Sequence, residues 1–262
     1  SWQGMERRDY LVEFDQQLKS CREIIDKWHQ SHNLRINIAM LTATLRQEHR
    51  QSLSEADFKK AESQARQARA LSRDRGTIFT QDGHTRGSVA FAHSLDLLGP
   101  DALLSHSTNL TEEEIAICAD TDTRIAHNPS AVASMLGRCP VVELIEAGVT
   151  VALGSDATAP DRSGDMFRHI QQAMHYHRTY FRDPDVLPPG RVLEMATIDA
   201  AQAVGLGNEI GSLEIGKKAD IILVDLARPH MAPFHMPAYR VTCFANGNDV
   251  TTVIVDGKIL MH

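Results

Sequence analysis

Residues 146–156 read EAGVTVALGSD, a stretch that closes one helix, turns at a glycine and runs into a strand. The helical pattern covers 141–147. The β-branched, apolar run at 149–153 predicts a buried strand that ends at Gly-Ser-Asp. The same alternation of helix and strand recurs toward the N-terminus. It predicts parallel β/α units, because parallel strands are joined by helical crossovers.

Four further strands are predicted before this one, at 34–40, 77–80, 102–106 and 124–127. Apolar residues spaced three and four apart predict helices before, between and after the strands. These helices cover 11–29, 54–75, 87–98, a segment starting at 111, 165–180 and 189–204. Ser54 and Thr111 precede two of them and are expected to cap their first turns.

The number of strands limits the architecture. Five β/α units occupy roughly 200 residues, whereas a closed eight-stranded barrel needs about 250. The α/β part, residues 1–205, is therefore either an open five-stranded sheet or the later portion of a longer barrel. Residues 206–262 are richer in turns and β patterns, at 221–225 and 250–255, with a hairpin signal at Asp256-Gly257. They predict a small β unit appended to the α/β part.

Composition excludes several classes of protein. The 262 residues are 42% hydrophobic and 23% charged, with a net charge of −7 and 13 histidines. These values are typical of a globular protein. The lack of a basic stripe argues against a nucleic-acid partner, and no apolar run reaches the ~18 residues of a membrane span. The four cysteines are far apart and form no CxxC pair, which favours free thiols and a cytoplasmic location.

Titratable residues follow four of the predicted strands. His84 comes just after one, His106 and His127 end two others, and Asp156 follows the last. The carboxyl ends of parallel strands face a common mouth, so these side chains could converge. Imidazole and carboxylate groups together could hold a divalent metal and activate its bound water. Each histidine alone is more often a hydrogen-bonded structural residue.

Five motifs in order give the chain a resemblance to a known family. They read LLSHSTNLT (103–111), IAHNPS (125–130), EAGVTVALGSD (146–156), GSLEIGKKADI (211–221) and VIVDGK (253–258). Together they resemble the amidohydrolase superfamily, and most closely its branch of aminohydrolases and chlorohydrolases. The resemblance covers the chain from about residue 10. It implies the C-terminal portion, strands four to eight, of a distorted (β/α)8 TIM-type barrel, with a small β unit.

The resemblance also implies a chemistry. Asp156 matches a metal ligand and general base, His106 matches a histidine that shuttles protons, and His127 matches a pocket residue. The implied cofactor is one divalent metal, zinc or iron. Its hydroxide would attack a ring carbon of a small N-heterocyclic substrate and release ammonia or chloride. The expected activity is hydrolytic deamination or dechlorination.

The chain departs from the family pattern in two places. The family's His-x-His metal pair follows its first barrel strand, but the match here is His175-Tyr176-His177, inside a predicted helix. Residues two apart on a helix point to different faces, so these do not share a metal. At the end of the fifth strand, Gln81 takes the ligand position and His84 the acidic one. His84 could replace the ligand, while Gln81 and Asp82 are candidate substrate contacts.

Several hypotheses remain open at this stage. Asp161 could touch substrate or belong to a solvated helix cap, and His169, His175 and His177 are expected at the surface or at an interface. An alternative function is a truncated or degenerate, metal-free family member that acts as a binding protein. A self-contained α/β hydrolase is disfavoured because no Gly-x-Ser-x-Gly elbow is present. An incomplete barrel would expose strand edges, which predicts a homo-oligomer or a partner chain.

Overall fold

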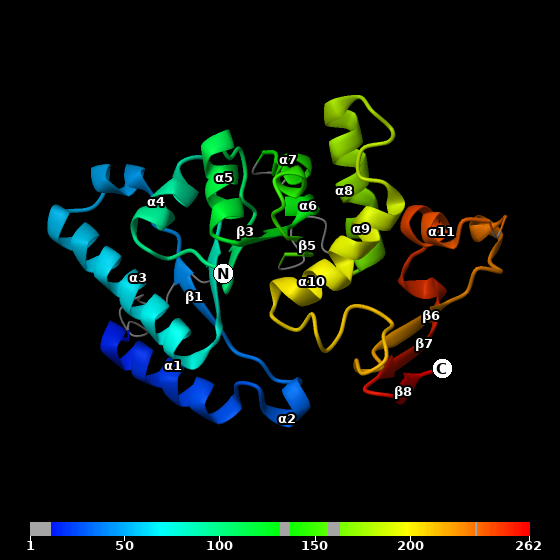
Figure 1. Cartoon of the computed structure of the whole chain (residues 1–262), viewed down its shortest axis with the longest axis horizontal. Coiled ribbons are helices and arrows are strands. Elements are labelled where there is room, and N and C mark those ends of the chain that lie inside the picture. The colour runs from blue at the N-terminus through cyan, green and yellow to red at the C-terminus, as the bar shows by residue number, and fades with distance from the viewer. Residues whose placement is uncertain (1–11, 132–136, 157–162, 234) are drawn as a thin grey trace, which may run out of the picture.

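A parallel sheet forms the centre of the molecule, and its strands follow one another in chain order (Figure 1). The computed structural model describes residues 12–131, 137–156, 163–233 and 235–262. Within these residues the strands are β1 (Ala39–Ala43), β2 (Ile78–Asp82), β3 (Ala102–Ser105), β4 (Arg124–His127) and β5 (Val151–Leu153). Every neighbouring pair is parallel. All five carboxyl ends therefore lie at one edge of the sheet, as the β/α pattern predicted.

Helices join the strands and cover the sheet (Figure 1). They are α1 (Phe14–Trp28), α2 (Ser31–Leu34), α3 (Glu55–Arg75), α4 (Ser88–Ser94), α5 (Glu112–Asp120), α6 (Pro129–Ala131), α7 (Val141–Glu146), α8 (Met166–Phe181), α9 (Pro189–Ala196) and α10 (Ile198–Ala203). The main core includes fully buried strand residues Phe79, Leu104 and Ile125. Their alternate neighbours Thr80 and Leu103 are only partly buried. One face of the sheet is thus sealed by helices more completely than the other.

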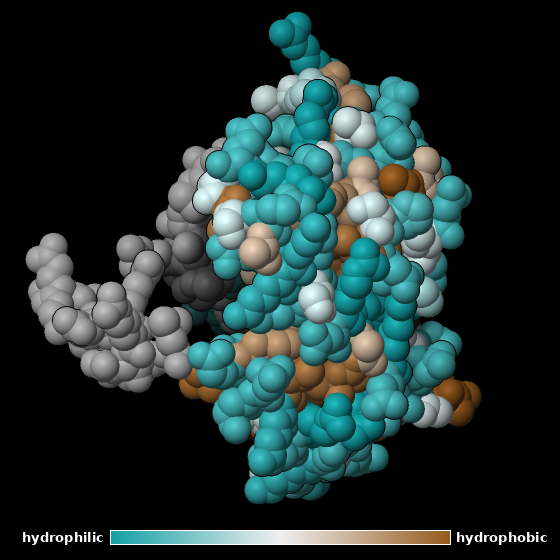
Figure 2. Space-filling model, turned by 90° about the vertical axis from the view of Figure 1, so that its left-hand side faces the viewer, coloured by the Kyte–Doolittle hydropathy of each residue, from teal (hydrophilic) through white to brown (hydrophobic). Residues whose placement is uncertain are grey.

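The predicted helix boundaries rest on local capping. The Ser54 hydroxyl accepts a hydrogen bond from the Asp57 amide at 3.1 Å, and Thr111 forms a capping box with Glu114. The helix that begins after Ser54 ends at Gly76, whose φ of 63° suits a residue without Cβ. Helix α1 packs on α3. On the side of the molecule that carries these helices, a hydrophobic band crosses a largely hydrophilic surface (Figure 2).

A small antiparallel sheet ends the chain (Figure 1). Its strands are β6 (Ile221–Val224), β7 (Val250–Val255) and β8 (Lys258–Met261), in that order. Helix α11 (Pro237–Phe244) packs on α8 and α9, and Gln171 donates a hydrogen bond to the Ala245 carbonyl at 3.1 Å. Short 3₁₀ turns complete the described elements: η2 (Gln47–Gln51), η4 (Pro229–Met231) and η5 (Gly247–Asp249).

The predicted α/β class is confirmed: a parallel sheet of five strands with its helices is followed by a small antiparallel sheet. Two predicted elements were wrong in their limits. The strand predicted at 34–40 begins only at Ala39, because residues 31–34 form a turn in which Asn33 and Leu34 have φ of 59° and 61°. The helix predicted at 189–204 is broken at Thr197, whose φ and ψ are −123° and −93°. Helix α11 was not predicted. The domain boundary at 205/206 stays a prediction.

Candidate active site

The carboxyl edge of the central sheet brings three predicted site residues together. The Nε2 atom of His106 lies 3.1 Å from Oδ1 of Asp82 and 3.5 Å from Oδ2 of Asp156. His106 is nearly buried, with 7% of its side chain exposed, while Asp156 is 25% and Asp82 69% exposed. The imidazole therefore sits between two carboxylates, one of them open to solvent.

Unusual backbone geometry places two of these residues. His106 and Asp156 have φ of 66° and 59°, in the left-handed region that non-glycine residues seldom adopt. Such conformations concentrate at functional sites, where the surrounding fold holds them. Gly154 precedes Asp156 for a steric reason, because a Cβ there would lie 2.3 Å from Oδ1 of Asn128. The Gly-Ser-Asp motif thus lets the chain turn tightly past β4.

His84 is buried beside this site, but its ring is held elsewhere. Its Nδ1 is 2.9 Å from the Ser88 hydroxyl, and its Nε2 has no hydrogen-bond partner within the described ranges. Burial lowers the pKa of His84 to about 3, and the nearby Arg46 charge adds to that effect. The imidazole is therefore neutral, the form that could bind a metal. Its role as a ligand stays a prediction.

Gln81 faces the neighbouring strand. Its amide nitrogen donates to the Ala43 carbonyl at 3.1 Å and lies 3.2 Å from the Thr42 hydroxyl, so the side chain ties β2 to β1. Its Oε1 is buried without a partner among the residues described. Asp161, another candidate substrate contact, lies outside the described residues. Whether Gln81 touches substrate stays a prediction.

Two histidines expected at the surface or at an interface are buried within the chain, so the prediction was wrong for them. His169 and His177 are 0% and 1% exposed, because they lie on the same face of α8 as Ile170 and Met174. The spacing of these apolar residues was a signal that could have placed them. His175 is exposed, so the two ends of the His-x-His motif do point apart. His177 instead meets His127, with ring centroids 5.4 Å apart.

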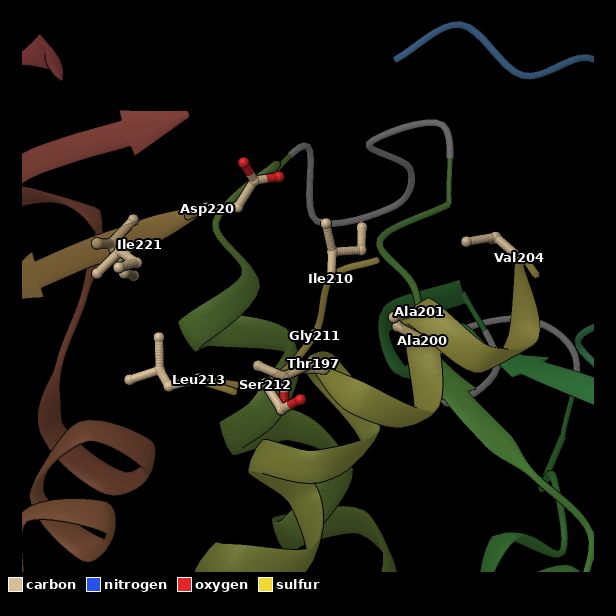
Figure 3. Close-up of a pocket in the computed structure, with 12 residues that line it drawn as sticks. Thr197, Ala200, Ala201, Val204, Ile210, Gly211, Ser212, Leu213, Asp220 and Ile221 are labelled. Carbon is tan, nitrogen blue, oxygen red and sulfur yellow. The ribbon is translucent and has the colours of Figure 1, made fainter. Parts of the chain in front are cut away.

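A cavity of about 510 Å³ lies away from these residues, between α9, α10 and β6 (Figure 3). Its walls are mostly aliphatic, with Ala200 and Ala201 on the helix and Ile210 and Ile221 opposite. Its one carboxylate, Asp220, is engaged by Arg35 at 2.6 Å. The cavity holds no set of catalytic groups, so the strand ends are the better candidate site.

Comparisons with known proteins show which family the chain belongs to. The model of the amidohydrolase family matches residues 13–260. The chain belongs to the amidohydrolase family. Part of a relative from Moorella thermoacetica, 5-methylthioadenosine/S-adenosylhomocysteine deaminase, is 42% identical over 174 residues. A 5'-deoxyadenosine deaminase from Methanosarcina acetivorans is 41% identical over 176 residues.

These matches cover only part of each relative. The aligned segments are 66% of this chain but 41% and 40% of the two deaminases, so the chain spans about two fifths of their length. An adenosine deaminase from Xanthomonas campestris with bound zinc superposes with a TM-score of 0.83 and 25% identity. That superposition covers 94% of this chain and 56% of the zinc enzyme. The amidohydrolase resemblance and the barrel-type fold are confirmed.

The metal that the family implies needs a set of ligands. In the described part of the chain, no three His, Cys, Asp or Glu side chains are grouped so that they could hold an ion. Imidazole and carboxylate are nevertheless the donors that zinc and iron take. These residues fit part of a ligand set and do not complete one.

The helices of the described part of the chain include none with the length and apolar character of a membrane span.

Proposed function

We propose that this chain carries part of the active site of a metal-dependent amidohydrolase that deaminates an amino-substituted N-heterocycle. The observation that carries the proposal is the His106 imidazole between the Asp82 and Asp156 carboxylates. The named activities of the relatives favour an adenine nucleoside, modified at the 5' position, as the substrate class. Dechlorination stays the alternative reaction, because a chloride could leave from the same ring position.

The side chains at the strand ends suit the proton transfers of that reaction. Water must lose a proton as it adds to the ring carbon, and the amino group must gain one to leave as ammonia. Asp156 can accept the first proton, and His106, in contact with it, can deliver a proton to the leaving nitrogen. A bound divalent zinc or iron would make the water more acidic. We propose that Asp156 is one ligand of this metal and that His84 is a second.

A chimera tests the function. The N-terminal part of the Moorella thermoacetica deaminase that this chain does not match would be fused to the chain. Release of ammonia from 5'-deoxyadenosine and methylthioadenosine would then be measured with zinc or iron added. We expect turnover by the chimera and little or none by the chain alone. Asp156→Asn and His106→Gln should each lower kcat by about 100-fold or more.

The same experiment distinguishes the alternative function. A chimera that folds but neither deaminates nor dechlorinates a heterocycle would contradict the proposal, and one that also binds no zinc would favour a metal-free binding protein. Glu113→Gln provides a matched control, because this carboxylate is exposed on α5. It should leave turnover unchanged. Stoichiometric zinc together with full turnover by the isolated chain would contradict the expectation that ligands are missing.

A further inference from the structure

His127 and His177 form a buried pair that the proposed deamination does not use. Each side chain is 1% exposed, and the two rings are tilted by 58° with centroids 5.4 Å apart. His127 ends β4, and His177 projects from α8. All four ring nitrogens are buried and lack a hydrogen-bond partner within the described part of the chain.

A cluster of buried, unpaired ring nitrogens indicates that something other than the described protein atoms binds there. Native proteins pair nearly all of their buried polar atoms, and clustered exceptions commonly mark an ion, a water or a ligand. A neutral imidazole presents one nitrogen lone pair that can accept a hydrogen bond or bind a metal. Two such rings in contact offer two lone pairs, one on each ring. No described protein atom donates a hydrogen bond to either lone pair.

A cavity adjoins both rings and provides the room. It has a volume of about 180 Å³ and is lined by both histidines together with Cys139, Tyr176 and Tyr180. This volume accommodates an ion and several solvent molecules. Arg138 also lines the cavity, but Glu143 binds its guanidinium at 2.9 Å, so their charges offset each other. A cation in the cavity would therefore not meet an unpaired positive charge.

The separation of the rings fits a shared ion. A ligating nitrogen lies roughly 1.15 Å from its ring centroid and about 2.1 Å from zinc, so two imidazoles on one tetrahedral ion have centroids about 5.3 Å apart. The observed separation is 5.4 Å. A bridging water would satisfy one atom on each ring but needs no such spacing. The separation of the rings is thus compatible with one shared metal ion.

We propose that His127 and His177 bind a transition-metal ion, Zn²⁺ or Ni²⁺, at a second site distinct from the strand-end carboxylates. Neutral imidazole is the preferred side chain for these ions. Solvent in the cavity completes the coordination sphere. The proposal does not depend on the deaminase function, because it involves neither Asp156 nor His106.

Histidine-selective ¹H–¹⁵N spectra of the isolated chain, recorded during titration with Zn²⁺, test the site. We expect one nitrogen of His127 and one of His177 to shift together and saturate with the same Kd. His127→Gln and His177→Gln should each weaken that Kd by at least about tenfold. His175→Gln, an exposed histidine on the same helix, should leave it unchanged, and so should Asp156→Asn.

Two results would overturn the proposal. One is saturation of the chain with Zn²⁺ and Ni²⁺ while both imidazoles of the wild-type pair keep their metal-free shifts, a result that needs no variant to fold. The other is an unchanged Kd in a folded His177→Gln variant. Failure of the chimera to deaminate, with this titration intact, would contradict only the proposed function.

Discussion

Arg69 is the largest fully buried charged side chain among the described residues, and a single carboxylate pairs with it. Its guanidinium binds Asp101 at 2.7 and 2.5 Å, and only 2% of the arginine side chain is exposed. Asp101→Asn would leave this cation buried without its counter-charge. We expect urea unfolding to show a loss of about 3 kcal/mol, the lower end for a broken buried pair, because Asp101 is 35% exposed.

A second pair on the same helix provides the control. Arg73 and Asp96 are 2.6 Å apart but 42% and 78% exposed, so Asp96→Asn should cost no more than about 1 kcal/mol. Equal losses in the two variants would contradict the importance of burial.

The Asp101 pair also predicts a pH dependence. Burial, the largest single effect, would raise the pKa of Asp101, but the hydrogen bonds and charge of Arg69, with smaller contributions from a backbone hydrogen bond and Arg73, together lower it overall. A carboxyl with a lowered folded-state pKa stabilises the fold above its unfolded pKa of about 4. That stabilisation is lost as pH falls through the folded pKa. The difference in unfolding free energy between wild type and Asp101→Asn should therefore shrink below about pH 4, measured by urea unfolding. A constant difference down to pH 2 would contradict it.

Between elements, one buried carboxylate joins two helices. Glu114 caps its own helix α5 by accepting from the Thr111 amide at 3.2 Å. Its other oxygen accepts from the amides of Val89 and Ala90, at 3.0 and 3.3 Å, in the first turn of α4. Glu114→Ala removes both sets of hydrogen bonds to a charged group. We expect a loss of about 3 kcal/mol in thermal or urea unfolding.

The neighbouring residue gives a matched comparison. Glu113 lies in the same helical turn but is exposed, so Glu113→Ala should change stability by less than about 0.5 kcal/mol. Glu114→Gln keeps one acceptor oxygen and should fall between the two. Equal stability of Glu114→Ala and Glu113→Ala would show that the link between α4 and α5 contributes nothing.

The same elements show what sequence could and could not predict. The caps at Ser54 and Thr111 depend on residues three positions away, and both are confirmed. The contact of Glu114 with α4 spans 25 residues, so no local pattern announces it. The predicted limits of β1 were wrong for a similar reason. The strand begins at Ala39 because Ala39 pairs with Ile78, a residue far away in the sequence.

The candidate site, like the fold, was predictable from the sequence only in part. The carboxyl ends of parallel strands lie at one side of a sheet. This rule was enough to predict that His106 lies near Asp156. Asp82 was expected only as a substrate contact, yet its carboxylate lies nearest the imidazole. The burial of His177 depends on packing between α8 and β4, which a helix-face argument confined to His175 and His177 does not reveal.

Across the whole molecule, one arginine ties the small C-terminal sheet to the opposite end of the chain. Arg35 binds Asp220 at 2.6 Å and Asp256 at 3.3 Å. These side chains are partly exposed, so Arg35→Ala should cost at most about 1 kcal/mol overall. Hydrogen exchange should nevertheless quicken in β6, β7 and β8, since the contact is local to that sheet. The exposed Arg22→Ala should leave exchange there unchanged, and equal exchange in both variants would contradict this anchoring role.

The open edge of the central sheet bears on the assembly of the whole molecule. Strand β1 ends the described sheet, and Leu41 on it is 64% exposed. An unpaired strand edge with an apolar side chain favours pairing with another chain. We therefore expect light scattering to detect a homo-oligomer, and Leu41→Lys to shift it toward the monomer. Leu53→Lys, at a 40% exposed position outside the strands, should not. A wild-type chain that stays monomeric at high concentration would contradict the expectation, because an edge that attracts no second copy must already be protected.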